Sequence, residues 1–158
     1  MRRRGVQASR AGFFLEDLEV GQNAELTRRV GEADIAAFAA VSGDVNPLHL
    51  DEAYAETTSF KGRIAHGMLS AAYISAVLGT ALPGPGAVYV SQNLRFRRPV
   101  RIGDEVTARA TVRTIDAGKS QATLATVCLV RGKTVVDGEA VVTVPRRPEA
   151  PIAGAARS

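Results

Sequence analysis

Hydrophobic and polar residues alternate through much of the chain, which predicts an antiparallel β-sheet. In residues 105–116, Val106, Ala108, Ala110 and Val112 share one face, while threonine and arginine residues occupy most of the other. Successive side chains of a strand point to opposite faces, so this pattern predicts one buried face and one solvent-exposed face. The predicted strands cover residues 24–29, 87–97, 105–116, 121–131 and 133–144, with turns at Gly118 and Gly132.

Residues 66–82 form the most apolar segment of the chain and contain no Asp, Glu, Lys or Arg. A helix that is apolar on nearly every side is buried on most sides. An antiparallel sheet that curves around such a helix covers it economically. The sequence therefore predicts an α+β protein with the hot-dog fold, in which the sheet wraps around a buried central helix.

Shorter elements are expected between the first strand and this central helix. Glu32 and Asp34 place acidic groups at the start of a helix, which ends at Ser42 and Gly43. Residues 44–50 are expected to form an irregular loop, because Pro47 cannot continue a helix. A short helix is expected over residues 52–56.

The composition describes one folded body between two basic ends. The chain has 158 residues, a net charge of +4 and 46% hydrophobic residues, which is typical of a single globular domain. The positive charge is concentrated in segments 1–12 and 146–158, which contain Arg2, Arg3, Arg4, Arg10, Arg146, Arg147 and Arg157. We therefore expect one domain over residues 13–145, disordered tails on both sides of it, and no nucleic-acid partner.

The cysteine content and the apolar segments narrow the class of protein further. Cys128 is the single cysteine, so neither an internal disulfide nor a cysteine-ligated zinc site is expected. The apolar stretches are shorter than the ~20 residues that cross a bilayer, and no apolar signal core follows the basic N-terminus. We expect a cytoplasmic protein without a membrane partner.

Residues 42–49 bring together the residue types that proton transfer requires. They read Ser-Gly-Asp-Val-Asn-Pro-Leu-His, and Pro47 together with a turn at Gly43 stiffens the loop so that Asp44 and His49 can face one point. A carboxylate and an imidazole at one point can activate water and move a proton. Taken singly, Asp44 could be a turn residue and His49 a surface or core histidine. The combination favours a catalytic pair, with Asn46 orienting a neighbouring group.

This segment resembles the hydratase-2 motif of the MaoC-like, (R)-specific enoyl-CoA hydratases. The matching residues are Phe38, Ser42, Gly43, Asp44, Asn46, Pro47 and His49. Two further similarities to the family are the run His66-Gly67-Met68 and the pattern Phe96, Pro99, Val100, Gly103, Asp104 and Val106. The resemblance extends over residues 13–144. Within the family, the chain most resembles short bacterial hydratases that feed polyhydroxyalkanoate synthesis.

The resemblance implies a hydration reaction and a role for each motif residue. Asp44 and His49 would hold one water above the C2=C3 bond of a trans-2-enoyl-CoA, and the product would be an (R)-3-hydroxyacyl-CoA. Asn46 would support this pair. The backbone N–H of Gly67, at the start of the central helix, would bind the thioester oxygen. His66 is expected to form a structural hydrogen bond to the backbone.

The resemblance also implies how the rest of the substrate is bound. Ser75 and Leu78, three residues apart on the central helix, would line a pocket for short to medium acyl chains. No metal or organic cofactor is indicated. Candidate cations for the substrate phosphates are Lys61, Arg63, Arg95, Arg97 and Arg98, each of which could equally be a solvent-exposed surface charge. A homodimer is expected, because one hot-dog unit leaves a sheet edge and a helix face incompletely covered.

The same fold also suits functions other than hydration. A 3-hydroxyacyl-thioester dehydratase of fatty-acid-type synthesis would use the same chemistry. A thioesterase is disfavoured, because hot-dog thioesterases generally place an acid on the central helix, where this chain has none. A non-catalytic acyl-CoA-binding module would have no need of both Asp44 and His49.

Overall fold

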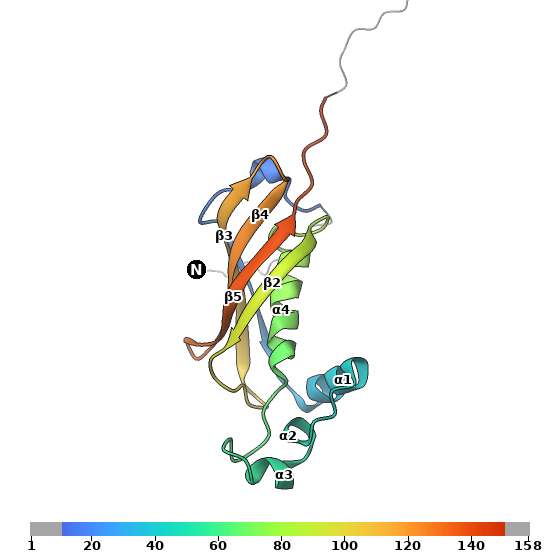
Figure 1. Ribbon diagram of the computed structural model, residues 1–158, viewed down its shortest axis with the longest axis vertical. Helices are drawn as coiled ribbons and strands as arrows, with labels where there is room; N and C mark the ends of the chain where they lie inside the picture. The colour runs from blue at the N-terminus through green and yellow to red at the C-terminus, as the bar shows by residue number, and fades with distance from the viewer. Residues whose placement is uncertain (1–10, 151–158) are drawn as a thin grey trace, which may run out of the picture.

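Five strands form one antiparallel sheet, and a long helix lies across one of its faces (Figure 1). The computed structural model describes residues 11–150, so segments 1–10 and 151–158 of the two predicted tails lie outside the described residues. The predicted α+β architecture is confirmed. The elements are η1 (Leu15–Asp17), β1 (Asn23–Arg29), α1 (Glu32–Ser42), α2 (Pro47–Leu50), α3 (Glu52–Glu56), α4 (Gly67–Thr80), β2 (Val88–Phe96), β3 (Glu105–Asp116), β4 (Gln121–Val130) and β5 (Lys133–Thr143).

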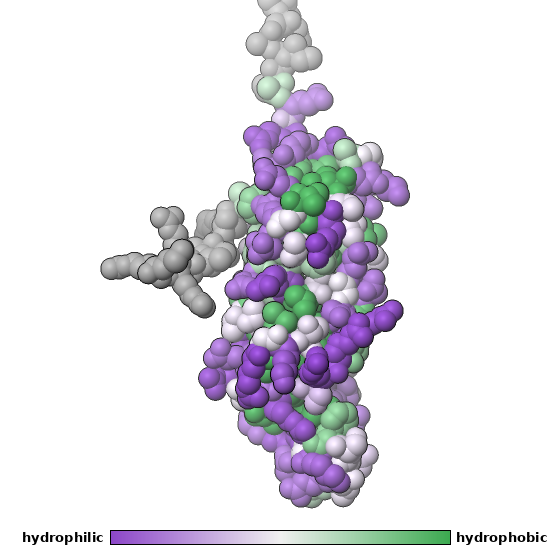
Figure 2. Space-filling view, turned by 90° about the vertical axis from the view of Figure 1, so that its left-hand side faces the viewer, coloured by the Kyte–Doolittle hydropathy of each residue, from purple (hydrophilic) through white to green (hydrophobic). Residues whose placement is uncertain are grey.

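The sheet has the strand order β1-β3-β4-β5-β2, so β1 and β2 are its edges. Each observed strand agrees with its predicted range to within one residue at either end. On β3, the side chains of Val106, Ala108, Ala110 and Val112 are all buried, as their alternation predicts. Figure 2 views the molecule from the left-hand side of Figure 1 and shows that the surface turned away from α4 is mainly hydrophilic.

The α4 helix packs on the buried face of the sheet through one of its sides. Its buried residues are Leu69, Ser70, Tyr73, Ile74, Val77 and Leu78. On the opposite side Met68 is 54% exposed, and Ala72 and Ser75 are exposed as well. In the single chain the sheet thus covers less of this helix than its apolar composition predicts. No helix within residues 11–150 is both long enough and apolar enough to span a bilayer.

Helices α1, α2 and α3 lie together beyond one end of the sheet (Figure 1). Helix α1 begins after Gly31, whose N–H donates to the Asp34 carboxylate at 2.7 Å. It ends at Gly43, whose φ of 77° is the left-handed conformation that glycine adopts readily. Its buried residues are Ile35 and Ala39. Helix α1 is therefore attached to the body by little hydrophobic packing.

The predicted loop over residues 44–50 contains a helical turn, α2, so that part of the prediction is wrong. Pro47 occupies the first position of this turn, where no backbone N–H is needed. The Asn46 side chain accepts a hydrogen bond from Leu48 N at 3.0 Å and caps the turn. The proline therefore starts a helix here instead of only interrupting one.

The C-terminal segment continues along the body beyond the predicted boundary at residue 145. Arg146 Nε donates to Ser120 Oγ at 2.8 Å. The backbone N of Arg147 donates to Glu16 Oε2 at 2.9 Å, and its side chain pairs with Asp17. Both arginines, which the sequence assigns to the tail, thus contact the folded body.

Candidate functional site

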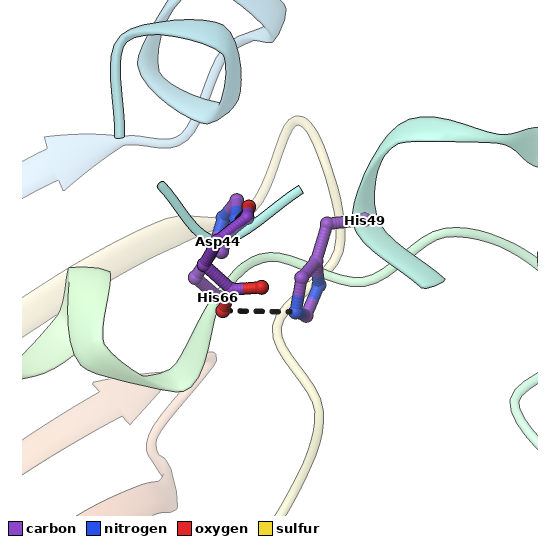
Figure 3. A group of neighbouring side chains, drawn as sticks. All are labelled: Asp44, His49 and His66. Atoms are coloured by element: carbon purple, nitrogen blue, oxygen red, sulfur yellow. Dashed lines mark hydrogen bonds and ion pairs between the residues drawn. The ribbon is translucent and has the colours of Figure 1, made fainter. Parts of the chain in front are cut away.

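A cavity of about 890 Å³ lies where the N-terminus of α4 meets α1, α2 and the connection between β2 and β3. Its walls include residues from all three segments that carry the family resemblance, namely Asp44 and His49, His66 and Gly67, and Phe96, Pro99 and Val100. Asp44, His49 and His66 lie next to one another in this cavity (Figure 3). The structure therefore brings the predicted catalytic pair and Gly67 to one place.

Asp44 is held in the turn that follows α1. Its N–H donates to Ser42 Oγ at 3.1 Å, and its Oδ1 accepts a hydrogen bond from Asn46 N at 3.2 Å. Its other oxygen, Oδ2, is the one nearest to His49, and the side chain is 48% exposed. Asp44 is thus a turn residue that still has one carboxylate oxygen for chemistry.

His49 lies on α2, and its ring is buried. Its Nδ1 is 2.8 Å from Ile64 O, and because a carbonyl only accepts hydrogen bonds, Nδ1 is the nitrogen that carries the proton. The neutral ring therefore presents the lone pair of Nε2, which lies 4.0 Å from Asp44 Oδ2. This separation is too long for a direct hydrogen bond. A water oxygen about 2.8 Å from both atoms fits between them.

His66, the residue before α4, lies behind Asp44 in Figure 3. Its Nε2 donates to Asp44 O at 2.9 Å, which confirms the predicted structural hydrogen bond to the backbone. The ring centroid lies 4.0 Å from that of His49 and 4.9 Å from that of Phe38. Nδ1 of His66 is buried and has no hydrogen-bond partner within residues 11–150. His66 thus fixes the Asp44 backbone while it packs against the His49 ring.

Gly67 is the first residue of α4 and lines the cavity. The N–H groups of a first helical turn have no acceptor within the helix, so the Gly67 N–H can meet a ligand at the positive end of the helix dipole. A Cβ atom at this position would lie 2.7 Å from Cε1 of the Phe96 ring. From the sequence, glycine is expected at this position because a side chain would obstruct the close approach of a ligand. Contact with Phe96, which was not predicted, is a second reason for it.

Asn46 supports the pair through its backbone and through its capping of α2. Its backbone N donates to Asp44 Oδ1 at 3.2 Å, and its side-chain Oδ1 accepts from Leu48 N at 3.0 Å. The helix that it caps carries His49. Asn46 therefore connects the turn that holds the carboxylate to the helix that holds the imidazole.

The two predicted acyl-pocket residues lie on different sides of α4. Ser75 lines a second cavity of about 490 Å³ between α4 and β2, which we call the α4–β2 groove. Phe38 and Met68 border both this groove and the first cavity, so the two are adjacent. Leu78 is 2% exposed, belongs to the core between helix and sheet, and borders neither cavity. The structure brings Ser75, but not Leu78, to the groove.

The five cations considered for the substrate phosphates do not lie together. Arg97 and Arg98 line the first cavity, whereas Lys61, Arg63 and Arg95 do not. Arg97 Nε lies 3.1 Å from both carboxylate oxygens of Asp137. The arginines of the β2–β3 connection are therefore the ones in reach of a ligand in this cavity.

Arg63 forms ion pairs with the first residues of α1 and α3. Its terminal nitrogens bind Glu32, and its Nε donates to Glu52 Oε2 at 3.2 Å. Hydrogen bonding to Arg63 lowers the pKa of the Glu32 carboxyl below its ordinary value. The sequence suggested only a phosphate contact for Arg63. Its partners are 31 and 11 residues away, and no local pattern indicates such pairs.

Residues 15–143 match the family model described as the MaoC like domain. The chain belongs to this family. It is 57% identical over 134 residues to the (R)-specific enoyl-CoA hydratase of Rhodospirillum rubrum, which covers 85% of this chain and 93% of that protein. It is 50% identical over 138 residues to the 3-hydroxybutyryl-CoA dehydratase of Methylorubrum extorquens, which covers 87% of this chain and 88% of that protein.

A solved structure shows the same likeness in three dimensions. The (R)-hydratase from A. caviae involved in PHA biosynthesis superposes with a TM-score of 0.80 and is 51% identical, covering 82% of this chain and 99% of that one. The predicted hot-dog fold and the predicted MaoC-like resemblance are both confirmed.

Asp44, His49 and His66 are also the residues that could hold a metal ion, since a donor atom of each lies within 4.8 Å of the others. The sequence indicates no metal, because it assigns His66 to the Gly67 turn. A metal ion binds imidazole in the plane of the ring. The ring centroids of His49 and His66 lie 4.0 Å apart with planes tilted by 33°. Nε2 of His66 already donates to Asp44 O, so this nitrogen has no lone pair for a metal. This arrangement favours proton transfer over metal binding.

We expect removal of divalent cations to leave the catalytic rate unchanged, because proton transfer between Asp44 and His49 needs no metal. The measurement compares the initial rate with crotonyl-CoA before and after treatment with EDTA and desalting. A loss of rate that Zn²⁺ restores would contradict this expectation and would make His66 a metal ligand.

Proposed function

We propose that this protein catalyses the reversible (R)-specific hydration of trans-2-enoyl-CoA to (R)-3-hydroxyacyl-CoA, a carbon–oxygen lyase activity. The observation that carries the proposal is the pair of Asp44 Oδ2 and His49 Nε2, which lie 4.0 Å apart in the cavity that Gly67 also lines. The 57% identity to an (R)-specific enoyl-CoA hydratase supports the same reaction.

Asp44 and His49 act together on one water molecule. The water lies between Oδ2 and Nε2 and attacks C3 of the enoyl thioester. One of the two groups accepts the proton that the water loses, and the other gives a proton to C2 on the same face of the double bond. Besides the proton on His49 Nδ1, the two facing atoms, Asp44 Oδ2 and His49 Nε2, share one proton before and after the reaction, so no further acid or base is needed. Attack from one face sets the configuration at C3.

The Gly67 N–H stabilises the negative charge that develops on the thioester oxygen. A donor that is in place before the charge appears contributes about 2.7–4 kcal/mol to such a transition state. The dipole of α4 adds to this effect, because its positive end lies at the same N–H. Through its contacts with Asp44 and Leu48, Asn46 holds the carboxylate and the imidazole at fixed positions relative to this donor.

The alternatives differ from hydration in what they require of the site. A 3-hydroxyacyl-thioester dehydratase would use the same groups in the reverse direction. A thioesterase with a covalent intermediate would require a nucleophile. Cys128 does not fit that role, since it is fully buried and burial raises the pKa of its thiol to about 12. A binding module that performs no chemistry would not need the Asp44–His49 pair.

Replacing Asp44 with Asn, or His49 with Ala, is expected to lower the hydration rate at least about 100-fold, because each substitution removes one proton-transfer group. The double variant should lose little more than the worse single variant, since the two groups act as a unit. The measurement follows the decrease in enoyl absorbance of crotonyl-CoA, with thermal melting to check the fold.

Glu56→Gln is the matched control, because this carboxylate is exposed and does not line the cavity. Near-normal turnover by Asp44→Asn or His49→Ala would contradict the assignment. Release of a free thiol without loss of the enoyl band would indicate a thioesterase. Binding of crotonyl-CoA with neither change would indicate a binding module.

The acyl chain runs from Gly67 along α4 into the α4–β2 groove. Apart from Ser75, Ser91 and the Tyr89–Gln92 pair, the lining of the groove is apolar, which suits a hydrocarbon chain. The expected substrates have short to medium chains of about four to six carbons.

Ser75→Leu is expected to lower kcat/KM for eight-carbon enoyl-CoA relative to crotonyl-CoA, because the larger side chain fills the groove. Each excluded methylene corresponds to about 0.8 kcal/mol, or roughly a fourfold change. Leu78→Ala should leave this ratio nearly unchanged and lower stability by about 2–5 kcal/mol, because Leu78 lies in the core and borders neither cavity. Thr80→Leu, one turn further and outside the groove, is the control. A raised ratio in Leu78→Ala would contradict this placement and would make Leu78 a determinant of chain length.

The chain forms a homodimer through α4 and β2. The edge strand β2 has exposed side chains at Val88 and Val90, which are 63% and 52% exposed. Met68, on the adjoining side of α4, is 54% exposed. An unpaired sheet edge beside an exposed apolar helix favours contact with a second subunit. Such a contact would close the open side of the α4–β2 groove.

Val90→Lys is expected to shift the protein toward the 16.6 kDa monomer, because it places a charge in this contact. Light scattering during size-exclusion chromatography measures the mass. Val20→Lys is the control, since Val20 is 68% exposed and lies before β1, away from the groove. An unchanged mass for Val90→Lys would show that the subunits meet elsewhere or not at all.

A further inference from the structure

The guanidinium group of Arg63 joins three elements that surround the catalytic pair. Both terminal nitrogens bind Glu32, the first residue of α1, and Nη1–Glu32 Oε2 is 3.1 Å. Nε donates to Glu52, the first residue of α3, at 3.2 Å, and Nη1 also lies 3.4 Å from His49 O on α2. The Arg63 side chain is only 17% exposed, so these contacts are partly shielded from water.

Two of the three residues after Arg63, Ile64 and His66, contact the catalytic residues directly. The backbone N of Ile64 donates to Leu48 O at 3.4 Å, and its carbonyl accepts from His49 Nδ1 at 2.8 Å. His66 Nε2 donates to Asp44 O at 2.9 Å. The segment 63–66 therefore contacts both members of the pair, and Arg63 joins this segment to the helices that carry them.

Helix α1 sets the position of Asp44. Ser42 Oγ donates to Phe38 O at 2.6 Å and accepts from Asp44 N at 3.1 Å, so Asp44 moves with the end of this helix. Helix α1 lies beyond the sheet and packs on the core through Ile35 and the partly buried Phe38 (Figure 1). The ion pair between Arg63 and Glu32 adds a directional contact to this packing. Arg63 connects α1 to α2 at the opposite end of α1, through Glu32.

We propose that Arg63 is a positioning residue for the reaction: it holds α1, α2 and α3 together and so maintains the spacing between Asp44 Oδ2 and His49 Nε2. The inference rests on the proposed hydratase function, because it assigns Arg63 to the proton-transfer step and not to substrate binding. Arg63 does not line the cavity, and its donors are engaged by the two glutamates and a carbonyl.

The kinetic experiment measures kcat and KM separately for Arg63→Gln and Arg63→Lys with crotonyl-CoA. Misplacement of a reacting group by about 1 Å can reduce a rate 100-fold, so Arg63→Gln should lower kcat by about 10- to 100-fold and leave KM nearly unchanged. Arg63→Lys keeps the charge but cannot bind three acceptors in a fork, so it should recover part of kcat. Glu32→Gln removes the α1 contact alone and should change kcat in the same direction.

Arg101→Gln is the matched control. Arg101 donates to the carbonyls of Phe60 and Gly62, in the loop just before Arg63, but it does not contact α1 or α2. The Arg101→Gln variant should have lower thermal stability without a comparable loss of kcat. A fall in melting temperature for Arg63→Gln with normal kcat would overturn the proposal and leave Arg63 a structural role. A rise in KM that depends on salt would instead indicate a phosphate contact. If Arg63→Gln does not fold, Arg63→Lys and Glu32→Gln carry the same test.

A second measurement does not depend on activity. The chain has two histidines, so the ring nitrogens of both can be assigned by ¹⁵N NMR. In the natural protein near pH 8, His49 should carry its proton on Nδ1 and His66 on Nε2, since those atoms face carbonyl oxygens. Arg63→Gln should move His49 toward a mixture of tautomers and leave His66 unchanged. An unchanged His49 signal would contradict the proposal even if the natural protein proved inactive with crotonyl-CoA, an outcome that would count only against the proposed function.

Discussion

Burial of one side of α4 against the sheet is the constraint on which the site depends. Tyr73, Ile74 and Val77 all lie in this contact, and side chains of this kind contribute about 1.5–3 kcal/mol each when fully buried. Their packing fixes the N-terminus of α4 at one end of the sheet, where the β2–β3 connection also passes. The Gly67 N–H therefore has a defined position before any ligand arrives, and the rest of the cavity is arranged around it.

Asp44 and His49, the two groups proposed for proton transfer, come from a part of the chain with much less hydrophobic packing. Helices α1 to α3 extend beyond the sheet, and hydrogen bonds and ion pairs from residues 63–66 tie them to the body (Figure 1). Hydrogen bonds depend on direction, whereas hydrophobic burial does not. A site built from hydrogen bonds can therefore keep Asp44 and His49 at a defined separation even though few apolar contacts support them.

The sequence predicted what depends on neighbouring residues and missed what depends on distant ones. Strand boundaries followed from alternation, and Asp44 and His49 followed from a motif whose members are close in sequence. The acceptor of His49 Nδ1 and the glutamate partners of Arg63 did not follow, because nothing local indicates which distant group will be near. Ser75 and Leu78 are about 60° apart around a helix, and that angle was enough to place one in the groove and the other in the core.

The two sides of helix α4 have different roles, stability of the fold and the lining of a groove. In other enzymes the same side chains must serve both. The inward side of α4 holds the fold together, and its outward side, including Ala72 and Ser75, lines the α4–β2 groove. A mutation on the outward side can reshape the groove without removing a contact from the core. Divergence in substrate range along this helix can therefore proceed through variants that remain folded, a route that is closed to proteins whose binding pocket is cut into the core itself.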